Sequence, residues 1–267
     1  MKIFLGPAGI PTISKPDTIS GIESVAKLGL NAMEVEFVQG VRMGNELAKQ
    51  AGKVAEEHRV RLSIHAPYFI NLCNEEKAQA SMKRILDSCE RGYYMNASVV
   101  VFHPGYYGGM QKDKAYEMVK QACIKMVDEI ERRGWNIKLG LETTGKHTAF
   151  GTLEENIRIA KEVKGCEVVV DFAHLYARAY GKINYSEIFD KLSKLSITHL
   201  HTHFSGIEFT MKGEKNHTPI NNNPPFEPLA KEIVKRKLNI TIISESPILE
   251  QDSLKMKKVF EGAGIKI

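Results

Sequence analysis

The sequence predicts a single (β/α)8 barrel, on the strength of three observations. Short β-rich runs alternate with longer amphipathic stretches from one end of the chain to the other. Eight such strand–helix units follow one another without a Ser/Pro-rich linker or a low-complexity block between them. A chain of 267 residues with 43% apolar residues can bury one large core. This pattern is typical of parallel α/β folds and, at this length, of a closed barrel. We expect one domain over residues 1–267, with a doubly wound open sheet as the alternative.

The expected elements follow in order, each strand as a short β-rich run and each helix as the amphipathic stretch after it. The first four units are KIFLGP with a helix near 16–28, AMEVEFV with 45–58, RLSIHAP with 75–96, and SVVVFHPG with 113–133. The last four are KLGLET with 153–163, CEVVVDFAH with 185–195, SITHLHTHF with 225–237, and NITIISES with 253–262. The connections 68–74 and 205–224 are longer than such a barrel needs, and long loops in compact domains are often functional.

Composition narrows the classes of protein that this chain can represent. Lys and Arg together number 37 and Asp and Glu 32, so the net charge of +5 permits a polyanionic partner without requiring one. The four cysteines have no CxxC spacing, which favours reduced thiols over a disulfide framework or a zinc ribbon. The N-terminal apolar run is too short for a signal peptide, and no stretch approaches the length of a membrane span. We expect a cytoplasmic, soluble protein that does not associate with membranes and that is a monomer.

Four of the nine histidines lie in one stretch, residues 196–217. His199, His201 and His203 alternate with apolar or β-branched residues, so a period of two places all three imidazoles on one face of a strand. Imidazole is a common metal ligand, and His217 follows beyond a loop. We expect His199, the deepest of the three, to be a hydrogen-bonded interior residue and either His201 or His203 to be a ligand.

Metal-capable residues also recur at the predicted strand ends. In a (β/α)8 barrel the chemistry takes place at the C-terminal ends of the strands. Six consecutive strands bring His, Asp or Glu to this rim, and buried carboxylates are costly unless they are paired or bound to metal. The residues concerned are His65, His103, Glu142, Asp171, His174, His201 or His203, and Glu245. His58 and His147 are expected to be ordinary surface residues.

So many nitrogen and oxygen donors exceed the needs of one octahedral ion and indicate two or three ions, with Glu142 as the bridging carboxylate. Ions so placed would lower the pKa of a shared water and stabilise a phosphodiester under attack. This chemistry is hydrolytic and needs no nucleophilic side chain. The sequence shows no GxSxG, P-loop or GxGxxG motif that would support other common chemistries.

Several motifs resemble those of the endonuclease IV type of apurinic/apyrimidinic DNA endonucleases, within the xylose-isomerase-like barrels. IHAPYFINL at 64–72 is similar to the family's His-x-x-Tyr-x-Ile-Asn-Leu signature, and FHPG at 102–105 to its His-Pro-Gly. The similarity continues in LETTGKHTAFGTLEEN at 141–156, VVDFAHLYA at 169–177 and SESP at 244–247. The resemblance implies a zinc-dependent hydrolase that cleaves damaged double-stranded DNA 5′ to abasic sites in DNA repair.

The resemblance also implies roles for individual residues. It assigns His65 and His103 to one zinc with bridging Glu142, and His174 with His217 to a third ion. The second ion would be held by Glu142, Asp171, His201 and Glu245. We take Glu142 and Glu245 as the candidate catalytic carboxylates, and Zn²⁺ as the metal, with Mn²⁺ as a possible substitute. Residues expected to contact DNA are Arg42, Tyr68, Phe69 and Lys215.

The chain departs from the family pattern at two of these places. The seventh strand reads His201-Thr-His203-Phe-Ser205 where the family has His-x-Asn-Asp-Ser, and the family's Asp-x-His appears as Lys215-Asn216-His217. A protonated ammonium cannot bind zinc, so Glu214 either replaces the aspartate or the third site is weakened. His203 and Glu214 are therefore candidates for an additional ligand or a supporting contact. The start, GPAGIPTIS, lacks the histidine that family members carry after the first strand.

Two other functions fit the same barrel. A one-metal sugar isomerase or epimerase would need only Glu142, Asp171, His201 and Glu245, with the glutamates moving protons. The surplus ligands His65, His103, His174 and His217 favour the multinuclear phosphodiesterase. A non-enzymatic binding module is the third alternative, and the intact set of carboxylates argues against it.

Overall fold

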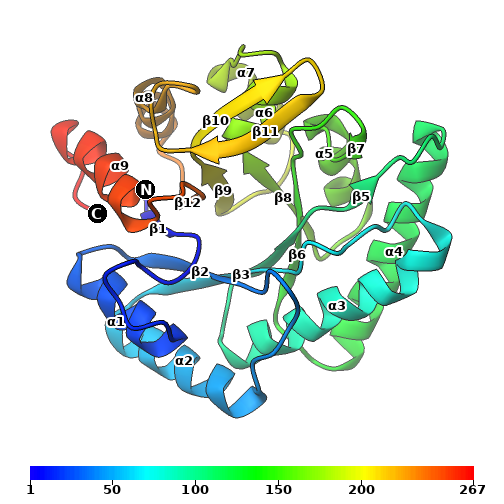
Figure 1. The fold of residues 1–267 in the computed structure, drawn as a ribbon, viewed down its shortest axis with the longest axis horizontal. Helices are drawn as coiled ribbons and strands as arrows, with labels where there is room; N and C mark the ends of the chain where they lie inside the picture. The colour runs from blue at the N-terminus through cyan, green and yellow to red at the C-terminus, as the bar shows by residue number, and fades with distance from the viewer.

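Eight parallel strands form the wall of a barrel in the computed structural model, which describes residues 1–267 (Figure 1). They occur in the spatial order β1-β12-β9-β8-β6-β4-β3-β2. Their bounds are β1 (Ile3–Pro7), β2 (Ala32–Glu36), β3 (Arg61–His65), β4 (Val99–Phe102), β6 (Lys138–Glu142), β8 (Cys166–Asp171), β9 (Leu200–Phe204) and β12 (Ile240–Ser244). The predicted (β/α)8 barrel is confirmed.

The barrel closes where the first two strands meet. Ala8 and Glu34 form an isolated parallel bridge, and the Gly9 amide donates to the Glu34 carbonyl at 2.9 Å. Gly6 permits this approach, because a Cβ atom there would lie 1.6 Å from the carbonyl oxygen of Ala32. The close contact of two backbones therefore explains the glycine in the first strand.

Helices surround the barrel and match the predicted stretches within a few residues (Figure 1). They are α1 (Thr18–Lys27), α2 (Asn45–His58), α3 (Glu75–Tyr94), α4 (Lys112–Arg132), α5 (Leu153–Glu162), α7 (Tyr185–Leu192), α8 (Phe226–Arg236) and α9 (Glu250–Gly262). The last helix begins three residues before its predicted start. Its buried first-turn residue Glu250 accepts hydrogen bonds from the backbone amide and the hydroxyl of Thr12, which joins this helix to the loop after β1.

A short helix that the periodicity did not predict, α6 (Phe172–Arg178), follows β8 directly. The Asp171 side chain caps it by accepting from the His174 amide at 2.6 Å. A carboxylate in this position satisfies a free amide of the first helical turn. The cap holds Asp171 and His174 next to each other at the rim of the barrel.

The long connection 205–224 is largely a β-hairpin of β10 (Gly206–Thr210) and β11 (Gly213–Thr218). Figure 1 shows it as two yellow strands lying beside α6, at the end of the barrel where β8 and β9 terminate. Ile207 packs against Ala173 and Ala177 of α6, which fastens the hairpin to the barrel. A second small ribbon pairs β5 (Gly105–Tyr106) with β7 (Ala149–Phe150).

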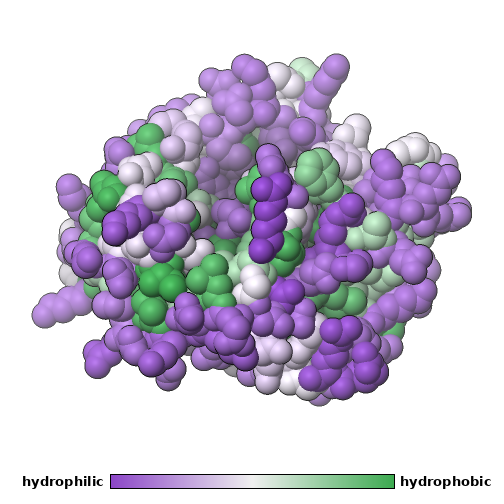
Figure 2. Space-filling model, turned by 60° about the horizontal axis from the view of Figure 1, so that its bottom comes forward, coloured by the Kyte–Doolittle hydropathy of each residue, from purple (hydrophilic) through white to green (hydrophobic).

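The main apolar core contains both strand and helix residues, including the fully buried Phe102, Phe172, Phe204 and Phe260. The four cysteines are also buried, and none forms a disulfide. On the face turned forward in Figure 2, hydrophobic residues form separate patches between hydrophilic side chains. None of the helices combines the length and the apolar character that crossing a bilayer would require.

Candidate metal centre

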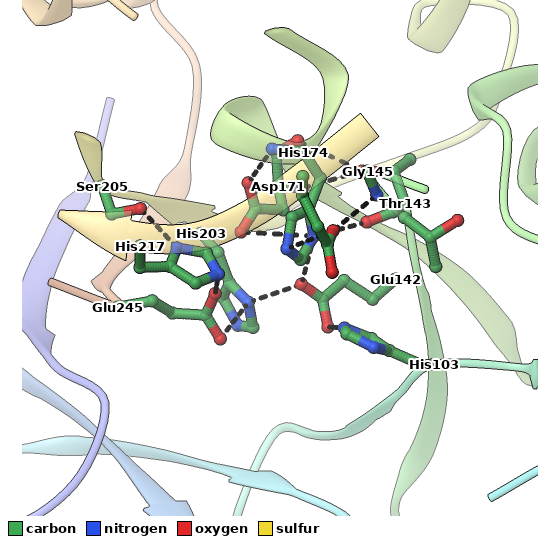
Figure 3. A network of polar contacts seen from close by, with 12 residues as sticks. His103, Glu142, Thr143, Gly145, Asp171, His174, His203, Ser205, His217 and Glu245 are labelled. Carbon is green, nitrogen blue, oxygen red and sulfur yellow. Dashed lines mark hydrogen bonds and ion pairs between the residues drawn. The ribbon is translucent and has the colours of Figure 1, made fainter. Parts of the chain in front are cut away.

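Histidine and carboxylate side chains at the ends of six strands converge at the C-terminal end of the barrel, and Figure 3 labels those of all but β3. His65, Glu142 and Asp171 are the last residues of β3, β6 and β8. His203 lies next to the end of β9, and Glu245 directly follows β12. Parallel strands end at the same rim, so residues far apart in the sequence meet there.

The first group of donors consists of His65, His103 and Glu142. Glu142 Oε2 lies 3.1 Å from His65 Nε2 and 2.7 Å from His103 Nε2. Glu142 is fully buried, whereas the His103 side chain is 34% exposed. The group therefore has one open side, toward the loop that follows β4.

The second group consists of Glu142, Asp171, His203 and Glu245. His203 Nδ1 lies 3.1 Å from Glu142 Oε1 and 3.1 Å from Glu245 Oε1, as Figure 3 shows. The two oxygens of Glu142 thus face different groups, Oε2 the first and Oε1 the second. This is the arrangement expected of a carboxylate between two cations.

His201, which the family resemblance assigns to the second group, lies deeper in the barrel. Its Nε2 atom is 2.9 Å from Glu34 Oε2 inside the barrel, and the group around Glu142 contains His203 instead. Both imidazoles are on the inner face of β9, but His203 is two residues, or roughly 6.6 Å, nearer the strand end. His201 forms a separate group of possible donors with Glu34 and His203, so His203 is the residue of β9 that belongs to both groups.

A third group of donors comprises Asp171, His174, His217 and Glu245. His217, on β11, points its Nε2 atom toward Glu245 Oε2 at 3.6 Å, while its Nδ1 atom is 2.5 Å from the Ser205 hydroxyl. The hairpin therefore adds to this group a histidine that no barrel strand supplies.

Glu214 and Lys215 lie on opposite sides of the hairpin. Glu214 Oε2 is 3.2 Å from His174 Nε2 and accepts from the Gly145 amide at 2.9 Å. The Lys215 side chain is 63% exposed, and its ammonium pairs with Glu208 at 3.1 Å. Glu214 is thus the residue of this pair that reaches the cluster.

Backbone carbonyls hold the rings of two of these imidazoles. His65 Nδ1 donates to the Ala66 carbonyl at 2.8 Å and His174 Nδ1 to the Thr143 carbonyl at 2.9 Å. A carbonyl can only accept, so the proton lies on Nδ1 and the lone pair on Nε2 faces the carboxylates. These contacts give each ring the orientation that a metal ligand requires.

Burial and the neighbouring imidazoles shift the pKa values of the carboxylates in opposite directions. Burial by itself would raise the pKa of Glu142, but the nearby His103 and His203 imidazoles hold it well below its ordinary value. Burial raises the pKa of Asp171 well above its ordinary value despite the attraction of His174. The Asp171 Oδ2 atom is buried and has no hydrogen-bond partner. A buried carboxylate oxygen without a hydrogen-bond partner, among nitrogen and oxygen donors, fits a divalent cation.

Two further carboxylates, Glu34 and Glu36, were not among the site residues predicted from the sequence. Both lie on β2, two residues apart, so both face the barrel interior. Burial raises the pKa of Glu36 to about 8. The signal was present in AMEVEFV, where two glutamates interrupt an apolar strand at a spacing of two.

The residues predicted to contact DNA lie outside the cluster. Tyr68 and Phe69, on the loop after β3, are 58% and 66% exposed. The Tyr68 ring lies 5.7 Å from the ring of His65, so this loop borders the first donor group. Arg42 is exposed on the loop after β2.

The remaining histidines lie away from the three groups. His199 precedes β9 and its Nε2 atom is 2.8 Å from the Thr241 hydroxyl, which agrees with the hydrogen-bonded role expected for it. His58 is exposed on α2, and His147 is half-buried and stacks on Tyr180 at 4.9 Å.

Residues 22–260 match the family described as Xylose isomerase-like TIM barrel. The chain belongs to this family. An uncharacterized protein of Methanocaldococcus jannaschii is 35% identical over 277 residues, covering 97% of each chain. A probable endonuclease 4 of Mycoplasma mobile is 28% identical over 207 residues, covering 73% of this chain and 72% of the relative.

Solved structures of the same fold include two kinds of enzyme. A D-tagatose 3-epimerase-like protein has a TM-score of 0.73 at 21% identity, covering 98% of this chain and 96% of that one. Endonuclease IV from Thermus thermophilus has a TM-score of 0.71 at 17% identity, covering 98% of each chain. At these identities the likeness concerns the fold alone. Proteins named as nucleases and proteins named as epimerases thus share this fold.

Proposed function

We propose that this protein is a metal-dependent phosphodiesterase that cleaves duplex DNA on the 5′ side of abasic sites in base excision repair. The observation that carries the proposal is the connection of three donor groups through shared carboxylates. Glu142 belongs to the first and second groups, and Asp171 and Glu245 belong to the second and third. One octahedral ion takes six donors, so eight residues arranged in this way suit two or three ions.

The donor set suits Zn²⁺, with Mn²⁺ as an alternative, because it combines imidazole nitrogen with carboxylate oxygen. When bound, two or three such ions supply a water of lowered pKa and positive charge for both oxygens of an in-line displacement. In this proposal, His65, His103 and Glu142 hold one ion, and Glu142, Asp171, His203 and Glu245 hold a second. His174 and His217 hold the third, with Glu214 as an additional donor.

The protein's own side chains would also orient the substrate. Glu142 and Glu245 are the proposed catalytic carboxylates, because Glu142 lies between two groups and Glu245, which is shared by the second and third groups, keeps 15% of its side chain exposed. Tyr68 and Phe69 are exposed aromatic residues next to the first group and could fill the gap left when a damaged nucleotide leaves the stack. Arg42 and Lys215 are exposed cations that would contact DNA phosphates.

The test uses duplex DNA that carries one tetrahydrofuran abasic analogue, together with metal analysis of the purified protein. We expect two or three ions per chain and cleavage that leaves a 3′-hydroxyl. Replacing Tyr68 and Phe69 together by alanine should weaken binding of this duplex without loss of metal. Tyr93→Ala, which alters a partly exposed aromatic side chain near the end of α3, is the matched control. Parent-like binding by the double variant would show that the two aromatics only pack the loop.

A second candidate function follows from the second group alone. Glu142, Asp171, His203 and Glu245 form a complete four-residue set for one ion, and epimerases share the fold. A one-metal sugar isomerase or epimerase would use these residues, with His203 in the place first given to His201. A single ion per chain, retained when His65 and His103 are both replaced, together with epimerisation of a ketohexose, would favour this function over the nuclease.

A further inference from the structure

Beneath the three connected groups lies a carboxylate that forms a separate group of possible donors with His201 and His203. Glu34 of β2 is fully buried inside the barrel. Its Oε1 atom is 2.9 Å from His203 Nε2, and its Oε2 atom is 2.9 Å from His201 Nε2. The Ser63 hydroxyl donates to Oε2 at 2.7 Å. These three polar neighbours explain how a full carboxylate is tolerated at this depth.

His203 has a carboxylate on each side of its ring. Its Nδ1 atom faces Glu142 and Glu245, and its Nε2 atom faces Glu34 on the opposite side of the ring. The Nδ1 atoms of His65 and His174 donate to backbone carbonyls, and His174 Nδ1 also lies 3.3 Å from Glu142 Oε1. The acceptor behind His203 is therefore stronger and carries a negative charge.

We propose that Glu34 is a positioning residue of the metal centre, an inference that depends on the proposed function. Its Oε1 atom lies 2.9 Å from His203 Nε2, so this oxygen is placed to accept a proton on Nε2 and to leave the lone pair of Nδ1 directed toward Glu142 and Glu245. A carboxylate in this place fixes the tautomer and the plane of the ring and makes the other nitrogen a better donor. Glu34 itself does not face the cluster, because the His203 ring lies between them.

His201 has a different task in this arrangement. Its Nε2 atom approaches the second oxygen of Glu34, and its Nδ1 atom has no hydrogen-bond partner. Together with Ser63 it holds the Glu34 carboxylate in place, while His203 alone connects that carboxylate to the centre. Substitution of Ser63 therefore provides a control that changes the environment of Glu34 without touching an imidazole.

The first experiment compares metal affinity in the parent, Glu34→Gln and Ser63→Ala proteins. Co²⁺ is titrated against a competing chelator, and the visible absorption of the bound Co²⁺ is recorded. Glutamine keeps the size of the side chain but removes the charge. Glu34→Gln should weaken binding roughly 10- to 100-fold and shift the absorption bands, the range typical of losing such a supporting contact. Ser63→Ala should change both much less, because Glu34 keeps its contact with His203.

The second experiment needs no variant and stays informative if Glu34→Gln does not fold. Long-range ¹H–¹⁵N spectra of the Zn²⁺-loaded parent, labelled at histidine, should show His203 protonated at Nε2. Protonation at Nδ1, or equal affinity and absorption in the parent and Glu34→Gln proteins, would refute the role of Glu34 while the metal centre stands. A parent protein that takes up neither Co²⁺ nor Zn²⁺ would refute the metal centre itself, and the role of Glu34 with it.

Discussion

Removal of metal should lower the melting temperature of this protein by a predictable amount. Glu142 and Asp171 are fully buried and Glu245 nearly so, and in each case the only ionic partners are imidazoles. A ligand that binds only the folded state at 100 times its dissociation constant stabilises that state by about 2.7 kcal/mol. A chain of 267 residues has an unfolding entropy of about 0.56 kcal/mol per kelvin at its melting temperature. Each ion should therefore raise the melting temperature by about 5 °C, and two ions by about 10 °C.

The assay is thermal unfolding followed by circular dichroism, first after dialysis against a chelator and then with increasing Zn²⁺ or Mn²⁺. The melting temperature should rise with the logarithm of free metal once the sites are filled. Glu142→Gln should reduce the rise, because an amide is a poor bridging ligand. Equal melting temperatures with and without metal would contradict the reasoning, since residues that bind an ion only in the folded state must stabilise it.

Three further predictions use pairs of neighbouring residues or a change of pH. His203→Gln should cost one ion in metal analysis, whereas His201→Gln should leave the metal content unchanged; the reverse result would restore His201 as the ligand. Glu214→Gln should reduce occupancy of the third group, whereas Lys215→Ala should not, because this lysine pairs with Glu208. Equal metal content in both variants would exclude Glu214 as a donor. Burial lowers the pKa of His199 from 6.5 to about 4, so the unfolded chain binds this proton more readily than the folded protein. Stability should be fully present above pH 6.5 and decline as the pH falls toward 4. His199→Asn should make this loss of unfolding free energy about 1–2 kcal/mol smaller, a figure that allows for the partial exposure of the imidazole. Urea unfolding at several pH values measures it. An identical pH dependence in both proteins would contradict the lowered pKa.

The arrangement of strands and helices could be read from the sequence because it depends on local periodicity. The run AMEVEFV and the stretch 45–58 have the periods of a strand and a helix whatever the rest of the chain does. Short-range patterns do not extend to α6, which has only seven residues and begins through the Asp171 cap. They also failed for the hairpin of β10 and β11, whose strands pack on α6 rather than into the barrel.

The composition of the candidate centre was likewise accessible, since His65, Glu142 and Asp171 end their strands and parallel strands end at one rim. The depth of each side chain inside the barrel could not be predicted from the sequence. His201 and His203 share a face of β9, and a period of two cannot tell which of them is level with Glu142. The register of β9 against β8, which places Asp171 opposite His203, decides this.

Sequence alone therefore determined the fold class and the kinds of donor at the rim, because both follow from residue type and spacing along one strand. Tertiary structure alone decided which donors meet. Closure of the barrel brings Glu34 of β2 under His203 of β9, although 169 positions separate them in the chain. Pairing within the hairpin turns Glu214 toward His174 and Lys215 toward Glu208. Such contacts depend on the register and closure of distant segments, and local patterns in a single sequence do not carry that information.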